Sequence, residues 1–168
     1  MKKGWQIFWH VFFWVGMISF FVFIAHNDSK ISNKGLFVIF GLYGCINIAL
    51  FYFNYLLLIP LFLDKKKYKL YALAVIITIA LLGVAKYGIA LAFKHWVLIR
   101  MSGAVVGFGA YFLSTVFTSI IFIFLSVVLQ FTLDWFTNER VQRDLENQRL
   151  TAELAFLKSQ INAHFLFN

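Results

Sequence analysis

Acidic residues, cysteine and proline are scarce in this chain of 168 residues. Only 13% of the residues are charged, with 7 Asp or Glu against 15 Lys or Arg, and 62% are hydrophobic. A water-soluble domain of this length has no interior large enough to bury so much apolar surface. In a bilayer the same side chains can face lipid, so the composition predicts a membrane protein. The single cysteine, Cys45, excludes an internal disulfide.

No long basic tract accompanies the net charge of +8. Lys and Arg occur instead in short groups between apolar runs. Nucleic-acid binding requires a continuous basic face on a folded domain, so that function class is excluded. We expect the basic groups to contact membrane lipid head groups and to set the topology of the chain.

Long hydrophobic runs occupy most of the first 133 residues, and each can cross a bilayer as a helix of roughly 20 residues. They lie at residues 5–25, 35–63, 70–93 and 101–133. The first run follows Met1, Lys2 and Lys3 as a signal peptide does, but it is bulky and aromatic and no small-x-small cleavage pattern follows it. We therefore predict an all-α fold in which residues 1–133 form a four-span transmembrane helical bundle.

The distribution of lysine predicts the orientation. Lys2 and Lys3 precede the first span, and the densest basic group lies at residues 65–69. Because positive residues favour the cytoplasmic side, four crossings put both groups and the C-terminus in the cytoplasm. Each external connector has under about a dozen residues, which is too few for a ligand-binding domain.

Three polar residues interrupt the predicted spans. Asn47 and Asn54 lie in the second span, and we expect them to hydrogen-bond across helices, with a ligand pocket as the alternative. Lys86 lies in the third span, about 24 Å along the helix from Leu70, near the outer membrane boundary. We expect Lys86 to extend to the head groups, although an intramembrane charge is also a candidate functional residue.

The character of the sequence changes at residue 134. From there to residue 162, charges of both signs occur without Gly or Pro, which predicts a water-exposed helix. Predicted i,i+4 ion pairs join Glu139 to Arg143 and Arg140 to Asp144.

Leucine and isoleucine form a stripe on this helix. Leu150, Leu154, Leu157 and Ile161 follow the 4-3-4 spacing of a coiled-coil seam. A helix this polar gains stability mainly by pairing. We therefore predict that residues 134–168 continue the bundle as a cytoplasmic, dimeric coiled-coil helix, which makes the protein a homodimer.

The last nine residues form the most specific motif of the chain. They are Gln160, Ile161, Asn162, Ala163, His164, Phe165, Leu166, Phe167 and Asn168. This segment resembles the histidine box of LytS-like sensor histidine kinases, Gln-Ile-Asn-Pro-His-Phe-Leu-Phe-Asn, at eight of nine positions. Residues 152–158 resemble the lead-in helix of that family. Residues 54–60 and 65–68 resemble the membrane half of its four-span members.

The resemblance implies a mechanism. In the family, the histidine of the box attacks the γ-phosphate of ATP, and the phosphoryl group then passes to an aspartate of a response regulator. His164 stands at that position, and a neutral imidazole is a nucleophile near physiological pH. The resemblance therefore implies a multi-pass sensor histidine kinase of a two-component system in the bacterial cytoplasmic (inner) membrane. Without an external domain, the stimulus is expected to act within the membrane or through a membrane partner protein.

The chain departs from the family pattern at Ala163, where the family has proline. Proline interrupts a helix, whereas alanine favours its continuation, so we expect the helix to run through the box. The alternative for His164 is an ordinary polar residue near the end of that helix.

A nucleotide site is not evident in the 168 residues. Phosphoryl transfer needs Mg²⁺ ligands and groups that hold the phosphates. Gly103, Gly107 and Gly109 lie in an apolar run rather than in a phosphate-binding loop. We therefore expect no cofactor or metal site in this chain alone, which should be inactive by itself. ATP and Mg²⁺ are expected in a catalytic domain beyond Asn168.

Two other function classes compete with the kinase. One is a non-enzymatic four-span membrane protein whose helical tail recruits partners. The other is a small transporter subunit, which is disfavoured because the sequence has no pair of broken helices and no paired intramembrane charges.

Overall fold

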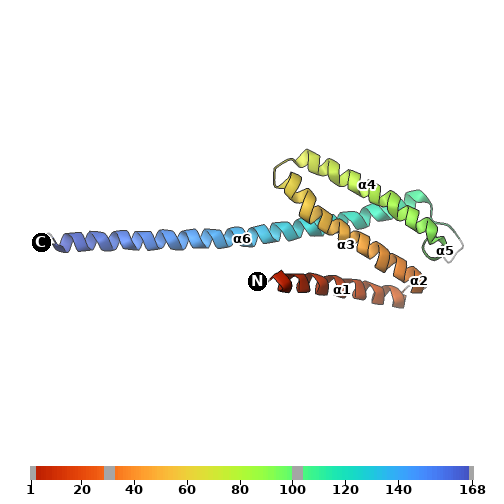
Figure 1. The fold of residues 1–168 in the computed structure, drawn as a ribbon, viewed down its shortest axis with the longest axis horizontal. Coiled ribbons are helices and arrows are strands. Elements are labelled where there is room, and N and C mark those ends of the chain that lie inside the picture. The colour runs from red at the N-terminus through yellow and green to blue at the C-terminus, as the bar shows by residue number, and fades with distance from the viewer. Residues whose placement is uncertain (1–2, 29–32, 100–103, 167–168) are drawn as a thin grey trace. The chain divides into compact units, whose positions relative to one another are not determined.

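The computed structural model describes residues 3–28, 33–99 and 104–166. The elements, in chain order, are α1 (Lys3–Asp28), α2 (Asn33–Leu36), the π-helical η1 (Phe37–Leu42), α3 (Tyr43–Phe53), the π-helical η2 (Asn54–Leu63), α4 (Tyr68–Ala92), α5 (Lys94–Val97) and α6 (Phe108–Leu166) (Figure 1). Among the described residues, the one β interaction is an isolated antiparallel bridge between Ile99 and Val105. The predicted all-α class is confirmed for this part of the chain.

The chain divides into two compact units, Met1–Val127 (the first unit) and Val128–Asn168 (the second unit). Four helical segments are long and apolar enough to cross a membrane. They are Phe8–Asn27, Asn33–Leu63, Tyr68–Ala92 and Phe108–Ser159. Large apolar side chains such as Phe23 and Leu81 point outward, each with 66% of its surface exposed. These lengths and exposed apolar faces are those of a multi-pass membrane protein, as the sequence predicted.

The fourth helix begins later than predicted. We expected the span to start at residue 101, but α6 begins at Phe108. Before it, Val106 lies beside Leu98, since the Val106 N–H donates to the Leu98 carbonyl at 2.8 Å next to the Ile99–Val105 bridge. Val105 and Val106 are β-branched and Gly107 follows them, which disfavours helix at these described residues.

The second span is helical without a break from Asn33 to Leu63, although it contains Pro60. Proline has no backbone N–H, so a regular α-helical hydrogen bond is lost there. The wider π-helical turns of η2 accommodate the loss, and the Asp64 N–H donates to the Ile59 carbonyl five residues back at 3.0 Å. Lys66, with a positive φ of 58°, then ends the helix and turns the chain toward α4.

Aromatic packing around Trp14 joins three helices of the first unit. The Trp14 ring stacks on Phe122 of α6 with centroids 5.8 Å apart, and it meets Phe51 of α3 edge-on at 5.0 Å. Its indole N–H donates to the Tyr52 hydroxyl at 3.1 Å. Trp14 is buried although its neighbours on α1 face outward, so it attaches α1 to the bundle.

Asn54 joins η2 to two other helices. Its Nδ2 donates to Ser126 Oγ of α6 at 2.7 Å, and its Oδ1 accepts from the Tyr71 hydroxyl of α4 at 3.1 Å. The expectation that Asn54 bonds across helices is confirmed. Interhelical hydrogen bonds in membranes contribute about 0.6 kcal/mol each on average, so these bonds define the register of the helices more than they stabilise the fold.

Gly83 permits a close approach of α4 and α6. A Cβ added at Gly83 would overlap the ring of Phe112, whereas a Cβ added at Gly88 on the same helix would have no heavy atom within 4 Å. Small residues allow helix backbones to approach in this way in membranes.

The two glycines give a matched test of this packing. Ala in place of a helical Gly gains about 0.5–1 kcal/mol, and we expect that gain for Gly88→Ala. Gly83→Ala must displace Phe112, so we expect a net loss of about 1–3 kcal/mol. Thermal unfolding of the purified variants in detergent measures both. Equal stability of the two variants would contradict the close approach at Gly83.

Candidate functional site

The histidine box lies at the C-terminal end of α6. The backbone of residues 160–166 continues this helix, which therefore runs through Ala163, as expected from alanine in place of proline. Phe167 and Asn168 lie outside the described residues, as do the side chains of Gln160, Ile161, Asn162, His164, Phe165 and Leu166. His164 thus stands on a helix that begins at Phe108, and the contacts of its imidazole are not defined.

The predicted seam is solvent-facing in the single chain. Leu150, Leu154 and Leu157 are each more than half exposed, and the side chain of Ile161 lies outside the described set. Spacings of four and three residues on α6 bring these leucines to one face of the helix. An exposed leucine stripe of this kind is what a partner helix would cover.

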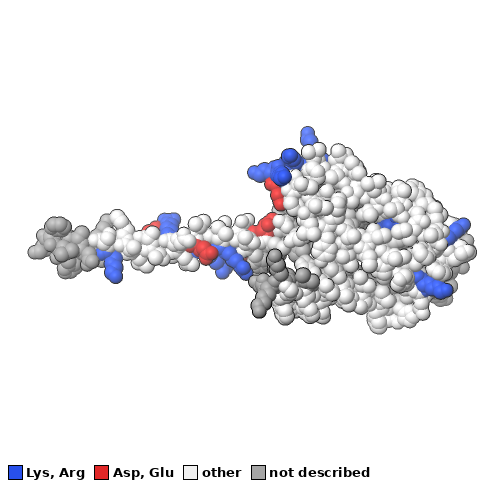
Figure 2. All heavy atoms as spheres, in the orientation of Figure 1, with Lys and Arg blue, Asp and Glu red and all other residues white. Residues whose placement is uncertain are grey.

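Ion pairs line the same helix. Arg143 pairs with Glu139 at 2.5 Å, as predicted, and Arg149 pairs with Glu153 at 2.8 Å. The predicted pair of Arg140 with Asp144 is not formed, although both residues are described. Figure 2 shows charges of both signs along the second unit, whereas in the first unit basic residues gather over the turn between η2 and α4. Such exposed pairs stabilise a helix by only about 0.3–0.5 kcal/mol each.

Lys86 is buried, which contradicts the expectation that it extends to the head groups. Its side chain is 3% exposed, and the buried residues of α4 are Gly83, Lys86 and Ala90. These three share one helix face, so the lysine lies on the face that the small residues pack against the bundle. The position of Lys86 along the helix did not predict its environment, because that position does not determine the direction in which the side chain points.

The contacts of Lys86 join α4 to α3. Lys86 Nζ donates to Asn47 Oδ1 at 2.5 Å, and the Tyr43 hydroxyl donates to the Lys86 carbonyl at 3.3 Å. The expectation that Asn47 bonds across helices is therefore confirmed. Among the described residues, no carboxylate pairs with Lys86.

The charge of Lys86 is only partly compensated. A lysine at the centre of a membrane helix costs about 2.5–3.5 kcal/mol by insertion scales, and less toward the helix ends. One interhelical hydrogen bond to a neutral amide returns about 0.6–1.7 kcal/mol. The ammonium has three N–H donors, of which Asn47 takes one. The site therefore has donor capacity left over.

A cavity of about 350 Å³ adjoins this lysine. Its polar lining comes from Tyr43, Asn47, Lys86, Tyr111, Ser114, Thr115 and Thr118, and Val97 of α5 and Val106 contribute apolar atoms. Tyr43, Asn47, Lys86 and Thr115 are themselves buried. A concave site with an apolar wall and a few convergent polar groups is typical of small-molecule sites.

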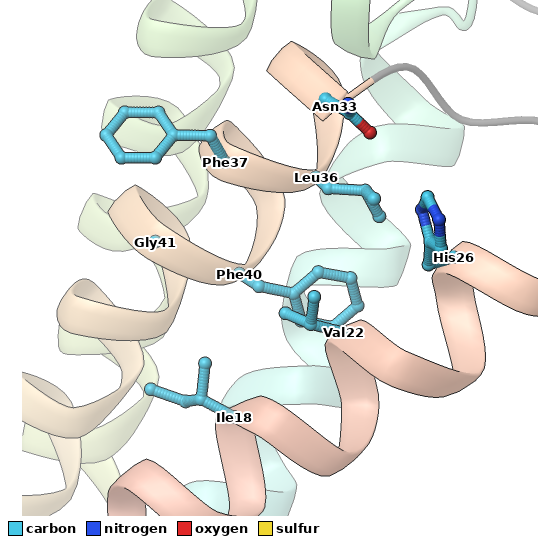
Figure 3. A pocket seen from close by; sticks show the side chains of 8 residues that line it. All are labelled: Ile18, Val22, His26, Asn33, Leu36, Phe37, Phe40 and Gly41. Carbon is cyan, nitrogen blue, oxygen red and sulfur yellow. The ribbon is translucent and has the colours of Figure 1, made fainter.

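A second cavity, of about 520 Å³, lies between α1 and the first part of the second span (Figure 3). Ile18, Val22 and His26 of α1 line one side, and Leu36 and Phe40 lie opposite. Its lining is mostly apolar, so it contains little that could orient a polar ligand.

No group of three or more His, Cys, Asp or Glu residues gathers in the described part of the chain, and so no metal site is proposed there.

The sequence did not single out Tyr43 and Tyr111 beside Lys86. A usable signal was present, because Tyr43 precedes Asn47 by four residues and Gly83 precedes Lys86 by three, which places each pair on one helix face.

Comparisons of this chain with models of protein families, with curated proteins and with solved structures find no match.

Proposed function

We propose that this chain is the membrane sensor and phosphoacceptor part of a sensor histidine kinase, with His164 as the phosphorylated residue. The observation that carries the proposal is the histidine box at residues 160–168, which agrees with the LytS-like pattern at eight of nine positions. A chance match of that length in a chain of 168 residues is most improbable.

The setting of the box supports the same function. It lies on the helix that also contains the fourth apolar segment, so one element carries both the span and the histidine. The exposed stripe of Leu150, Leu154 and Leu157 is suited to pairing two copies of this helix, which supports a homodimer. A response regulator would accept the phosphoryl group from His164, and ATP and Mg²⁺ would bind in a catalytic domain outside these 168 residues.

Substitution of His164 tests the central claim. We expect His164→Gln to reduce phosphate incorporation to background, because the amide cannot act as the nucleophile. The protein is used as its gene encodes it, including any sequence beyond Asn168, reconstituted in liposomes with labelled ATP and Mg²⁺. The label on the wild type should be stable in alkali and labile in acid, as a phosphohistidine is.

His95→Gln is the matched control, since His95 is an exposed histidine of α5 outside the box, and it should retain full labelling. Labelling that survives in His164→Gln would contradict the phosphoacceptor role. A wild type that takes up no label would favour the alternative, a membrane protein whose tail recruits partners without catalysis.

Disulfide crosslinking tests the homodimer. In a Cys45→Ser background, we expect Leu154→Cys and Leu157→Cys each to form a covalent dimer on mild oxidation in membranes, because seam residues of paired helices face each other. Ala152→Cys is the control, since it lies two residues before Leu154, away from the seam face. Non-reducing electrophoresis reads out the result. Equal crosslinking at all three positions would show random collision and would contradict the seam.

A further inference from the structure

We infer that the cavity beside Lys86 is an intramembrane binding site for a small oxyanion, a carboxylate or phosphate group. Lys86 Nζ and Asn47 Nδ2 would bind it, and Thr115 and Thr118 line the wall of the cavity. The binding itself does not depend on the proposed kinase activity. That the anion is the stimulus of the sensor is a consequence that does rest on the proposed function.

The first support is the charge. Lys86 is buried in the first unit, and its one recorded hydrogen bond goes to a neutral amide oxygen. Buried charges in membranes are normally paired, and they mark substrate or ion sites when they are not. The sequence has no Asp or Glu between residues 29 and 63 or between residues 65 and 133, so neighbouring spans supply no carboxylate.

The second support is the set of donors and acceptors. Asn47 presents its Oδ1 to Lys86, so its Nδ2 group is left as a donor without an acceptor among the described residues. Thr115 and Thr118 donate their hydroxyl protons to carbonyls of α6, at 3.2 Å to Tyr111 and 3.0 Å to Thr115 respectively. An ammonium and an amide N–H₂ that converge on one cavity match the charge and the acceptor-only oxygens of an oxyanion.

The third support is the space. The volume of about 350 Å³ suits a small metabolite or one lipid head group. Val97 and Val106 line the cavity on the side of α5 and its connector, which places the cavity at the end of the first unit where α4 ends. An anion from the water phase or a head group from the membrane interface would meet the site at that end.

Thermal stability of the purified chain tests the binding. The probes are acetate and inorganic phosphate, titrated against chloride at constant ionic strength in a neutral detergent. In parallel, the chain is placed in nanodiscs of phosphatidylglycerol or phosphatidylcholine. We expect a rise in Tm that grows with the logarithm of ligand concentration above Kd, of about 2–4 °C at about four times Kd, for at least one of the two oxyanions or for phosphatidylglycerol over phosphatidylcholine. A response to acetate or phosphate identifies a free anion, and a response to phosphatidylglycerol alone identifies a lipid head group.

Variants assign the response to the site. Lys86→Met should abolish the rise in Tm, and without anion it should be at least as stable as wild type, because an uncompensated charge is removed. Asn47→Ala should keep the charge but bind with a higher Kd. Lys69→Met, which removes an exposed lysine from the start of the same helix, should respond as wild type does.

Three outcomes would overturn the inference. One is the absence of a response to every probe, and another is an equal response in Lys86→Met. The third concerns Asp28, whose side chain lies outside the described residues. If Asp28→Asn and Lys86→Met each lower Tm without anion, the lysine has an internal counter-ion and the cavity needs no ligand. None of these results depends on phosphorylation of His164, so failure here is distinct from failure of the proposed kinase.

Discussion

The interior of a bilayer offers no water, so every polar group there must find its partner within the protein. The arrangement of the first unit follows from this constraint. Asn54 meets it on both sides of its amide, because its Nδ2 donates to Ser126 and its Oδ1 accepts from Tyr71, on two different helices. Lys86 meets it only in part, because a single neutral amide faces its ammonium. Asn54 therefore joins helices of the bundle, whereas the ammonium of Lys86 has hydrogen-bond donors available to a ligand.

Small residues determine where the helices can approach closely enough for these contacts. Gly83 lies against the ring of Phe112, one turn of α4 before Lys86, and Ala90 lies one turn after it. A larger residue at either position would separate the backbones and open the face on which the lysine lies. Close packing on both sides thus keeps Lys86 turned inward. The cavity exists because Ile39 of η1 and the aromatic and hydroxyl side chains of α3 and α6 do not fill the remaining space.

The two candidate sites share an element. Thr115 and Thr118, which line the cavity, and His164, which is the proposed phosphoacceptor, all belong to α6. For the proposed sensor, connectors too short for a separate ligand-binding domain imply a stimulus that acts within the membrane or through a membrane partner protein. A ligand changes the balance between two states of a helix only through a difference in its affinity for them. An anion bound in the cavity beside Lys86 would lie against α6, because α6 residues form part of the cavity wall.

The sequence by itself determined the class of the protein. The apolar runs predicted four spans and an all-α fold, because a helix must satisfy its backbone within the bilayer and needs a defined length to cross it. The sequence also singled out the histidine box at residues 160–168 and the leucine stripe before it. Only the tertiary structure decided the direction of Lys86, the partners of Asn47 and Asn54 and the later start of α6. These features depend on which faces of the helices meet, and in an all-apolar span the hydrophobic pattern does not distinguish a face toward lipid from a face toward protein.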